Sequence, residues 1–172
     1  MSLLRKIGFS TILLFSNGLT ATAQDTTTQQ PLWQMRETVG DWSIMCATSS
    51  PDTCRMVQVR TSNEGQKGRL LEVNLGKHGE NALMIMTLPF GLDLRVGGVM
   101  KVDNKPEVKF DYSTCTPEGC QAILPVDADM MKTLQNGSEM SVGFSPWGND
   151  QTLVVKASLK RSAAAMTKLG LR

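Results

Sequence analysis

The sequence predicts an all-β protein, an antiparallel β-sandwich with one short inserted helix and, in one of two interpretations, a helix at the C-terminus. Short apolar or alternating runs recur along the chain, and stretches rich in Gly, Pro, Asn or Asp separate most of them. Alternation with a period of two places one face of a strand in a core and the other outside it. Repeated short strands of this kind are typical of sandwiches and barrels.

The expected elements follow from these runs in order. Strands are predicted at residues 41–47, 54–61, 70–75, 82–88, 92–96, 98–103, 107–112, 120–125, 139–144 and 152–159. Residues 127–137 interrupt the strand pattern: they begin with an aspartate suited to capping, carry apolar residues at helical spacing and end in Asn-Gly. We therefore expect a short helix between two strands there.

The amino terminus has the order of features of a secretory signal. Arg5 and Lys6 precede a mostly apolar run, and Ala21-Thr22-Ala23 supplies small residues for cleavage. The run is too short to cross a bilayer, which takes about 20 apolar residues. A buried helix of a cytoplasmic protein, the alternative, does not account for this order. We interpret residues 1–23 as a signal peptide, 24–36 as a flexible leader and 37–172 as a single domain of an exported protein.

The charge balance argues against a nucleic-acid partner. The chain has 18 Lys and Arg and 16 Asp and Glu, and the signal contains two basic and no acidic residues, which leaves 16 of each (18 − 2 = 16). Nucleic-acid binders normally carry a basic excess gathered into a patch. Because the basic residues here alternate with acidic and apolar ones, we expect no such partner.

Four cysteines, Cys46, Cys54, Cys115 and Cys120, predict two disulfides. In an exported chain this arrangement is more common than a metal site or a redox pair. Neither local spacing is C-x-x-C, and the chain has one histidine to complete a mixed site. We therefore expect no metal and no cofactor.

The turn residues favour local pairing among the three connectivities that four cysteines allow. In "CTPEGC", Pro117 and Gly119 suit the second and last positions of a type I turn. Such a turn places Cys115 and Cys120 opposite each other on adjacent strands, where a disulfide fits. The loop "CATSSPDTC" can close Cys46 onto Cys54 in the same way.

Four motifs together resemble the invasion-associated locus B proteins of bacterial cell envelopes. They are "GDWSIMC" (40–46), "CRMVQ" (54–58), "LPFGLDL" (88–94) and a Cys-x4-Cys pair that ends in "GCQA" (119–122). The resemblance implies a β-sandwich that is periplasmic or associated with the outer envelope, in a family linked to host-cell invasion. The family has no established catalytic residues, so the resemblance implies none here.

Methionine-rich residues 82–91 are open to two interpretations. A strand there places Met84 and Met86 on one face and Leu83 and Ile85 on the other, so both faces are apolar. The strand is either central and covered on both sides, or it exposes an adaptable methionine surface to a partner or an apolar ligand, with Phe90 at the rim. On the second interpretation, Met84, Met86 and Phe90 are candidate partner-binding residues.

The C-terminal segment "LKRSAAAMTKLGLR" (159–172) also has two interpretations. It is either a helix packed on the sandwich or a basic amphipathic segment that contacts anionic lipid or a partner. In the second case the contact is peripheral and involves Lys160, Arg161, Lys168 and Arg172. Family members often continue with Gly-Phe where this chain has Lys160-Arg161, so the resemblance does not imply how the segment docks.

The sequence and the family resemblance together favour an exported, non-catalytic envelope protein. The resemblance implies that it contacts an unknown protein partner in the envelope or on a host cell, in invasion or envelope maintenance. The alternative is a small periplasmic enzyme with a dispersed site. A candidate base is His78, whose ordinary pKa lies nearest neutrality. Glu80 is its only close acidic neighbour, and an exposed turn residue is the favoured interpretation. Neither a G-x-S-x-G nor an H-E-x-x-H motif occurs, so we expect no catalytic residue.

Overall fold

The computed structural model describes residues 32–62 and 68–171. The predicted signal peptide and residues 24–31 of the predicted leader lie outside this part. The elements in chain order are β1 (Trp33–Val39), β2 (Trp42–Ala47), β3 (Ser50–Thr61), β4 (Arg69–His78), β5 (Asn81–Leu88), β6 (Gly98–Val102), β7 (Val108–Phe110), β8 (Thr114–Thr116), β9 (Gly119–Val126), α1 (Ala128–Asn136), β10 (Glu139–Phe144), β11 (Leu153–Ser158) and α2 (Ser162–Lys168).

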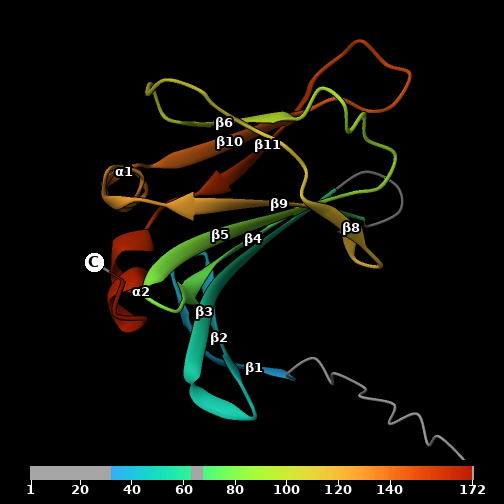
Figure 1. The fold of residues 1–172 in the computed structure, drawn as a ribbon. Helices are drawn as coiled ribbons and strands as arrows, with labels where there is room; N and C mark the ends of the chain where they lie inside the picture. The colour runs from blue at the N-terminus through green and yellow to red at the C-terminus, as the bar shows by residue number, and fades with distance from the viewer. Residues whose placement is uncertain (1–31, 63–67, 172) are drawn as a thin grey trace, which may run out of the picture. The chain divides into compact units, whose positions relative to one another are not determined.

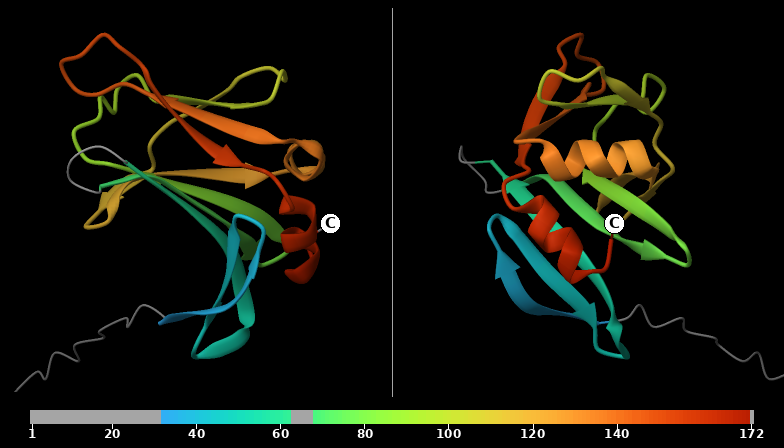
Figure 2. Two further views of the ribbon diagram at one scale, coloured as in Figure 1. Left: turned by 180° about the vertical axis from the view of Figure 1, so that it is seen from behind. Right: turned by 90° about the vertical axis from the view of Figure 1, so that its left-hand side faces the viewer.

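Two antiparallel sheets form a sandwich, as the sequence predicts. The large sheet has the order β1-β2-β3-β4-β5-β9-β8, and the small sheet has the order β11-β10-β6-β7. Figure 1 shows the two sheets as separate layers, with both helices at one end and the loops that follow β5 and β10 at the other. The view from behind in Figure 2 shows the same arrangement.

The core lies between the sheets and is rich in methionine. Met84 and Met86 on β5 are 1% and 0% exposed, and they pair across the sheet with Leu75 and Val73 of β4. The interpretation of Met84 and Met86 as an exposed partner surface is therefore wrong. These side chains point into the sandwich because the period of two places them on the face that the small sheet covers.

Both disulfides join the local pairs that the turns favour. Cys46 bonds to Cys54 and Cys115 bonds to Cys120. Each pair is also a cross-strand pair, the first between β2 and β3 and the second between β8 and β9. One bridge therefore fastens the edge strand β8 to β9, and the other fastens β2 to β3, beside the opposite edge strand β1.

The two helices pack against each other at one end of the sandwich. The side chain of Asp127 caps α1 by accepting a hydrogen bond from the Met130 N–H at 2.8 Å. On α2 the buried residues are Ser162, Ala165 and Met166, and the Ser162 hydroxyl donates to the Leu134 carbonyl of α1 at 2.7 Å. Residues 162–168 of the C-terminal segment therefore form a packed helix.

Two sequence-based boundaries need correction. β1 begins at Trp33, so residues 33–36 belong to a strand of the sheet and not to the leader. Most of its side chains are exposed because it is an edge strand, which weakens its alternating pattern. Residues 92–96 form a loop with a single bridge from Leu92 to Pro146, not a strand. Among the residues the structure describes, no helix is long and apolar enough to span a membrane.

Candidate functional site

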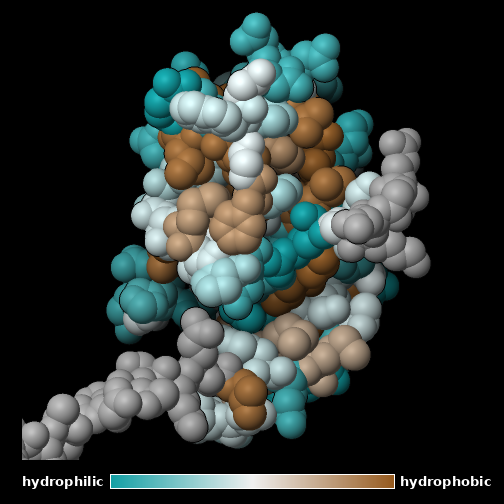
Figure 3. Space-filling model, turned by 90° about the vertical axis from the view of Figure 1, so that its right-hand side faces the viewer, coloured by the Kyte–Doolittle hydropathy of each residue, from teal (hydrophilic) through white to brown (hydrophobic). Residues whose placement is uncertain are grey.

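Two loops at the end of the sandwich opposite the helices expose a group of apolar side chains. The first loop joins β5 to β6 and the second joins β10 to β11. Phe90, Leu94 and Val96 on the first and Trp147 on the second are all exposed, at 61%, 47%, 64% and 62%. We call these four residues the loop-end patch. Figure 3 views the molecule from this side, and brown and tan side chains gather on it.

Backbone hydrogen bonds join the two loops. The Asp93 N–H donates to the Ser145 carbonyl at 2.9 Å, and the Trp147 N–H donates to the Gly91 carbonyl at 2.7 Å. Gly91 has a φ of +82°, a conformation that side chains disfavour. Between these bonds, Leu92 is buried and anchors the first loop in the core. The loop-end patch therefore projects from an anchored backbone.

A charged pair supports the aromatic side chain of the second loop. Arg95 donates to Asp93 from Nε at 2.9 Å and from Nη2 at 2.7 Å. These side-chain hydrogen bonds, with the charge of Arg95, hold the pKa of the Asp93 carboxyl below its ordinary value. The Arg95 guanidinium also lies 4.6 Å from the centroid of the Trp147 ring. This contact connects the first loop to the indole of the second.

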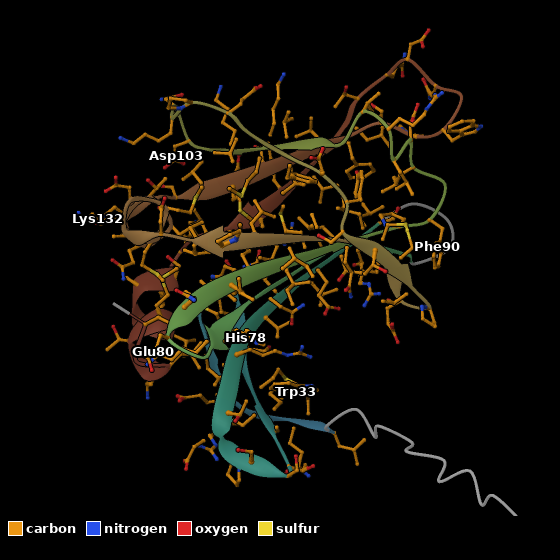
Figure 4. The ribbon with its side chains drawn as sticks, viewed as in Figure 1. Trp33, His78, Glu80, Phe90, Asp103 and Lys132 are labelled. Carbon is orange, nitrogen blue, oxygen red and sulfur yellow. A yellow bond between two sulfur atoms is a disulfide. The ribbon has the colours of Figure 1, made fainter. Side chains whose placement is uncertain are left out.

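The structure places the candidates of the methionine-rich segment in two different surroundings. Phe90 is on the surface, and Figure 4 shows it at the end of the ribbon away from Glu80, Asp103 and Lys132. Met84 and Met86 are in the core. Trp147 is a member of the patch that our sequence analysis missed. An available signal was its setting in "SPWGND", because a tryptophan between Pro and Gly lies outside any alternating strand.

The basic candidates lie at the helix end, on the side of the sandwich opposite the loop-end patch (Figure 1). Lys160, Arg161 and Lys168 are exposed, and Lys168 pairs with Glu37 of β1 at 3.2 Å. Arg172 lies outside the described residues. Because Ala165 and Met166 are buried within the protein, a contact with a membrane or a partner at this end would involve the basic side chains and not an inserted apolar face.

His78 and Asp103 lie in different parts of the structure (Figure 4). His78 is exposed at the end of β4, and none of the hydrogen bonds or ion pairs among residues 32–62 and 68–171 joins it to Glu80. The carboxylate of Asp103 accepts the N–H groups of Ser138 and Glu139 at 2.9 and 3.0 Å. No group of three or more His, Cys, Asp or Glu side chains in the described part is placed to hold a metal ion.

Comparison with known proteins identifies the family. The family model described as invasion associated locus B protein matches residues 42–170. This chain belongs to the invasion associated locus B family. An invasion protein B homolog of Brucella abortus is 31% identical over 137 residues, which cover 78% of this chain and 79% of the relative. The invasion protein B of Bartonella bacilliformis is 25% identical over 113 residues, 64% of this chain and 60% of that protein.

A solved structure confirms the fold of this family member. The crystal structure of invasion associated protein b from Bartonella henselae matches with a TM-score of 0.69 at 21% identity, over 80% of this chain and 95% of that chain. The segment "LPFGLDL" (88–94), one of the motifs that carry the resemblance, contributes Phe90 and Leu94 to the loop-end patch. The family is bacterial and is linked by name to invasion, and this chain contains two disulfides. Together these features indicate an exported protein.

Proposed function

We propose that this protein is exported to the periplasm or the outer envelope and acts there without catalysis, by binding a protein partner through the loop-end patch. The partner lies in the envelope or on a host cell, and the role is host-cell invasion or envelope maintenance. The observation that carries the proposal is the exposure of two aromatic side chains, Phe90 and Trp147, on loops whose backbones are hydrogen-bonded to each other.

Surface chemistry supports a protein contact at the patch. Aromatic residues are enriched at the centres of protein interfaces, where they supply much of the binding free energy. Because the two loops are already joined by backbone hydrogen bonds, little additional ordering is needed when a partner binds. The names of the relatives, which refer to invasion, support the broader role.

The engagement of the acidic side chains supports a non-catalytic role. Asp127 caps α1 and Asp103 accepts two backbone N–H groups, so both carboxylates have structural partners. A general acid or base needs a pKa tuned toward the working pH and a position within reach of a reacting group. Among residues 32–62 and 68–171, no hydrogen bond or ion pair gives the exposed His78 side chain a partner that would orient it as a base.

Affinity capture from the native envelope with a cross-linker tests the proposal. The double variant Phe90→Ser/Trp147→Ser should lose the captured partner and remain folded, because both side chains are exposed. Leu32→Ser is the matched control, since it removes an exposed apolar side chain immediately before β1. If the double variant is folded and captures the partner at the wild-type level, the patch is not the binding site.

A second set of variants tests the basic end in the same assay. Lys160→Gln/Arg161→Gln/Lys168→Gln should weaken capture mainly at low salt if these charges assist association, because the Debye length is about 8 Å at 0.15 M. A loss in this set with wild-type capture by the patch variant would move the contact to the helix end. Unchanged capture in both sets would remove both surfaces from the proposal.

A further inference from the structure

A cleft on the outer face of the large sheet lies on a surface separate from the loop-end patch. Its floor and walls come from the cross-strand row Arg55–Gly76–Leu83 on β3, β4 and β5, and from Asn74 and Ile85 in the next row. Trp33 of β1 reaches the same cleft, which has a volume of about 230 Å³. Drug-sized ligand pockets run to about 300–1,000 Å³, so this cleft accommodates about one large side chain.

Gly76 creates the space at the centre of the cleft. A Cβ at this position would lie 3.1 Å from the Arg55 Cβ and 3.4 Å from the Cys54 carbonyl oxygen. Its absence leaves a gap between Arg55 and Leu83, and the neighbouring walls, Leu83 and Ile85, are apolar and only half-buried. An apolar group in this gap would remove their remaining exposed surface from water.

Two buried polar atoms of opposite kind belong to residues of the cleft and lack partners within the described part of the chain. Asn74 is 6% exposed, and its amide nitrogen donates to Glu72 Oε1 at 2.8 Å while its Oδ1 accepts no hydrogen bond. The Nε of Arg55 also has no partner, and the guanidinium lies 3.9 Å from the Trp33 ring centroid. Burial lowers the pKa of Arg55. A ligand that forms hydrogen bonds with such unpaired groups binds more favourably, because their desolvation is then compensated.

The charged side chains that line the cleft are those of Arg55 and Lys77. Glu72 lies beside them, since it accepts from Asn74 and attracts Arg55. Its carboxylate is already paired with Arg69 at 2.6 Å, which leaves the lining itself positive. A second cavity of about 500 Å³ shares Lys77 and His78 with the cleft and is also lined by Arg36 and Lys168, with Asp52 as its acidic member. Lys168 is paired with Glu37, so Arg36 and Lys77 are the cations left to attract an anion there.

We propose that the cleft and the adjoining cavity bind an extended acidic peptide segment of a protein partner. One apolar side chain of the peptide occupies the cleft against Trp33, Leu83 and Ile85, and a neighbouring Asp or Glu meets Lys77 and Arg36. Both unpaired atoms are inaccessible in this conformation, so Arg55 first turns from its place over Trp33. A peptide group then supplies an N–H for Asn74 Oδ1 and a carbonyl for Arg55 Nε. A fatty acid supplies no N–H donor, so it would leave Asn74 Oδ1 unpaired.

An array of immobilised peptides of the form acetyl-Gly-Gly-X-Z-Gly-Gly, with all residues tested at X and Z, examines the proposal on the intact oxidised protein. Retained peptides should combine a large apolar residue with an adjacent Asp or Glu. Lys77→Glu should weaken their binding about 10- to 100-fold, the equivalent of one charge-assisted hydrogen bond, and should shift the preferred charged residue to Lys or Arg. Leu83→Ser should weaken binding without changing the preferred charge.

Lys109→Glu on β7 is the matched charge control and should bind like the wild type, since Lys109 is exposed on the small sheet. Phe90→Ser/Trp147→Ser should also bind the array normally, so that this site and the loop-end patch can fail separately. The proposal would be overturned if no peptide bound more tightly than the all-glycine peptide. It would also be overturned if neither Lys77→Glu nor Leu83→Ser changed peptide binding. Two alternative occupants would overturn it as well: phosphatidylglycerol vesicles bound through Lys77, or a dimer that Leu83→Ser dissociates.

Discussion

Gln58 and Ser158, 100 residues apart in the chain, form two hydrogen bonds that connect the two sheets. The side chain of Gln58 on β3 donates from Nε2 to the Ser158 carbonyl at 2.9 Å and accepts the Ser158 N–H at Oε1 at 2.7 Å. Ser158 ends the edge strand β11, whose other neighbour is β10. The Gln58 amide thus takes the place of a neighbouring strand at the end of β11.

We expect Gln58→Leu to lower the free energy of unfolding by about 1–3 kcal/mol, because it leaves the N–H and carbonyl of Ser158 without their partner. Leucine retains most of the side-chain volume, so the loss reports on hydrogen bonding more than on packing. Urea denaturation of the oxidised protein measures the change. Gln34→Leu, at an exposed position of β1, is the control, and an equal effect of the two substitutions would contradict the role of Gln58.

Gln58 also shows where sequence reasoning stops. Its place in the alternating run "CRMVQVRT" puts it on the core face of β3, so a buried polar residue could be predicted. Its partner could not, because a hydrogen bond between residues so far apart depends on how the two sheets stack. Local features were predictable for the opposite reason: the Asp127 cap and the two disulfide turns depend on residues within about ten positions of each other.

The sequence indicates only part of the loop-end patch. Phe90 was a candidate because it follows an apolar strand. Trp147 was not, because its approach to Arg95 depends on the pairing of two loops more than fifty residues apart. Residues 92–96 alternate like a strand, yet the glycine with positive φ before them and the buried Leu92 make them a loop. Periodicity cannot reveal such a conformation.

The Cys115–Cys120 bridge should stabilise the fold independently of the other bridge. Chain entropy predicts about 2–3 kcal/mol for a loop of this length, so Cys115→Ser/Cys120→Ser should lower the melting temperature by several degrees. Non-reducing peptide mapping of the variant should still find Cys46 joined to Cys54. A melting temperature equal to that of the wild type would show that the β8–β9 hairpin needs no covalent support.

Met86→Ala should be strongly destabilising, because the Met86 side chain is fully buried on the inner face of β5. Removing a buried methionine side chain to alanine typically costs about 2–5 kcal/mol, through lost burial and the cavity that remains. Met35→Ala on β1 is the control: Met35 is 65% exposed and should change the free energy of unfolding by less than about 0.5 kcal/mol. Similar values for the two variants would refute the core assignment.

Tyr112 should titrate at unusually high pH. Burial raises the pKa of its phenol to about 12, and its hydroxyl has no hydrogen-bond partner in the described part. Since the folded pKa exceeds the unfolded value of about 10, the unfolded chain ionises first and stability falls as pH rises from about 10 toward 12. The chain has one tyrosine, so phenolate absorbance reports on Tyr112 alone.

The absorbance midpoint of Tyr112 should therefore move from near 12 in the folded protein to near 10 in concentrated urea. Tyr112→Phe removes the absorbance signal and serves as the baseline. Because the substitution also deletes an unpaired buried hydroxyl, it should not reduce the free energy of unfolding at neutral pH. A midpoint near 10 in the native protein would contradict the burial of the hydroxyl.

The organisation of the loop-end patch should depend on the ionisation of Asp93. Its carboxylate holds Arg95, and Arg95 lies over the Trp147 ring. Because the folded pKa of Asp93 lies below its ordinary value, the interaction is present above about pH 3.9 and is lost as the pH falls through the lower, folded value. Acidification should therefore release Arg95 and change the fluorescence of Trp147, obtained as the difference between the wild type and Trp147→Phe.

Asp93→Asn should give the acid-like Trp147 spectrum at neutral pH and show no acidic transition. Asp129→Asn, at an exposed carboxylate of α1, should show the same acidic transition in Trp147 fluorescence as the wild type. An identical neutral spectrum for Asp93→Asn and the wild type would show that Trp147 is positioned by the loop backbone alone.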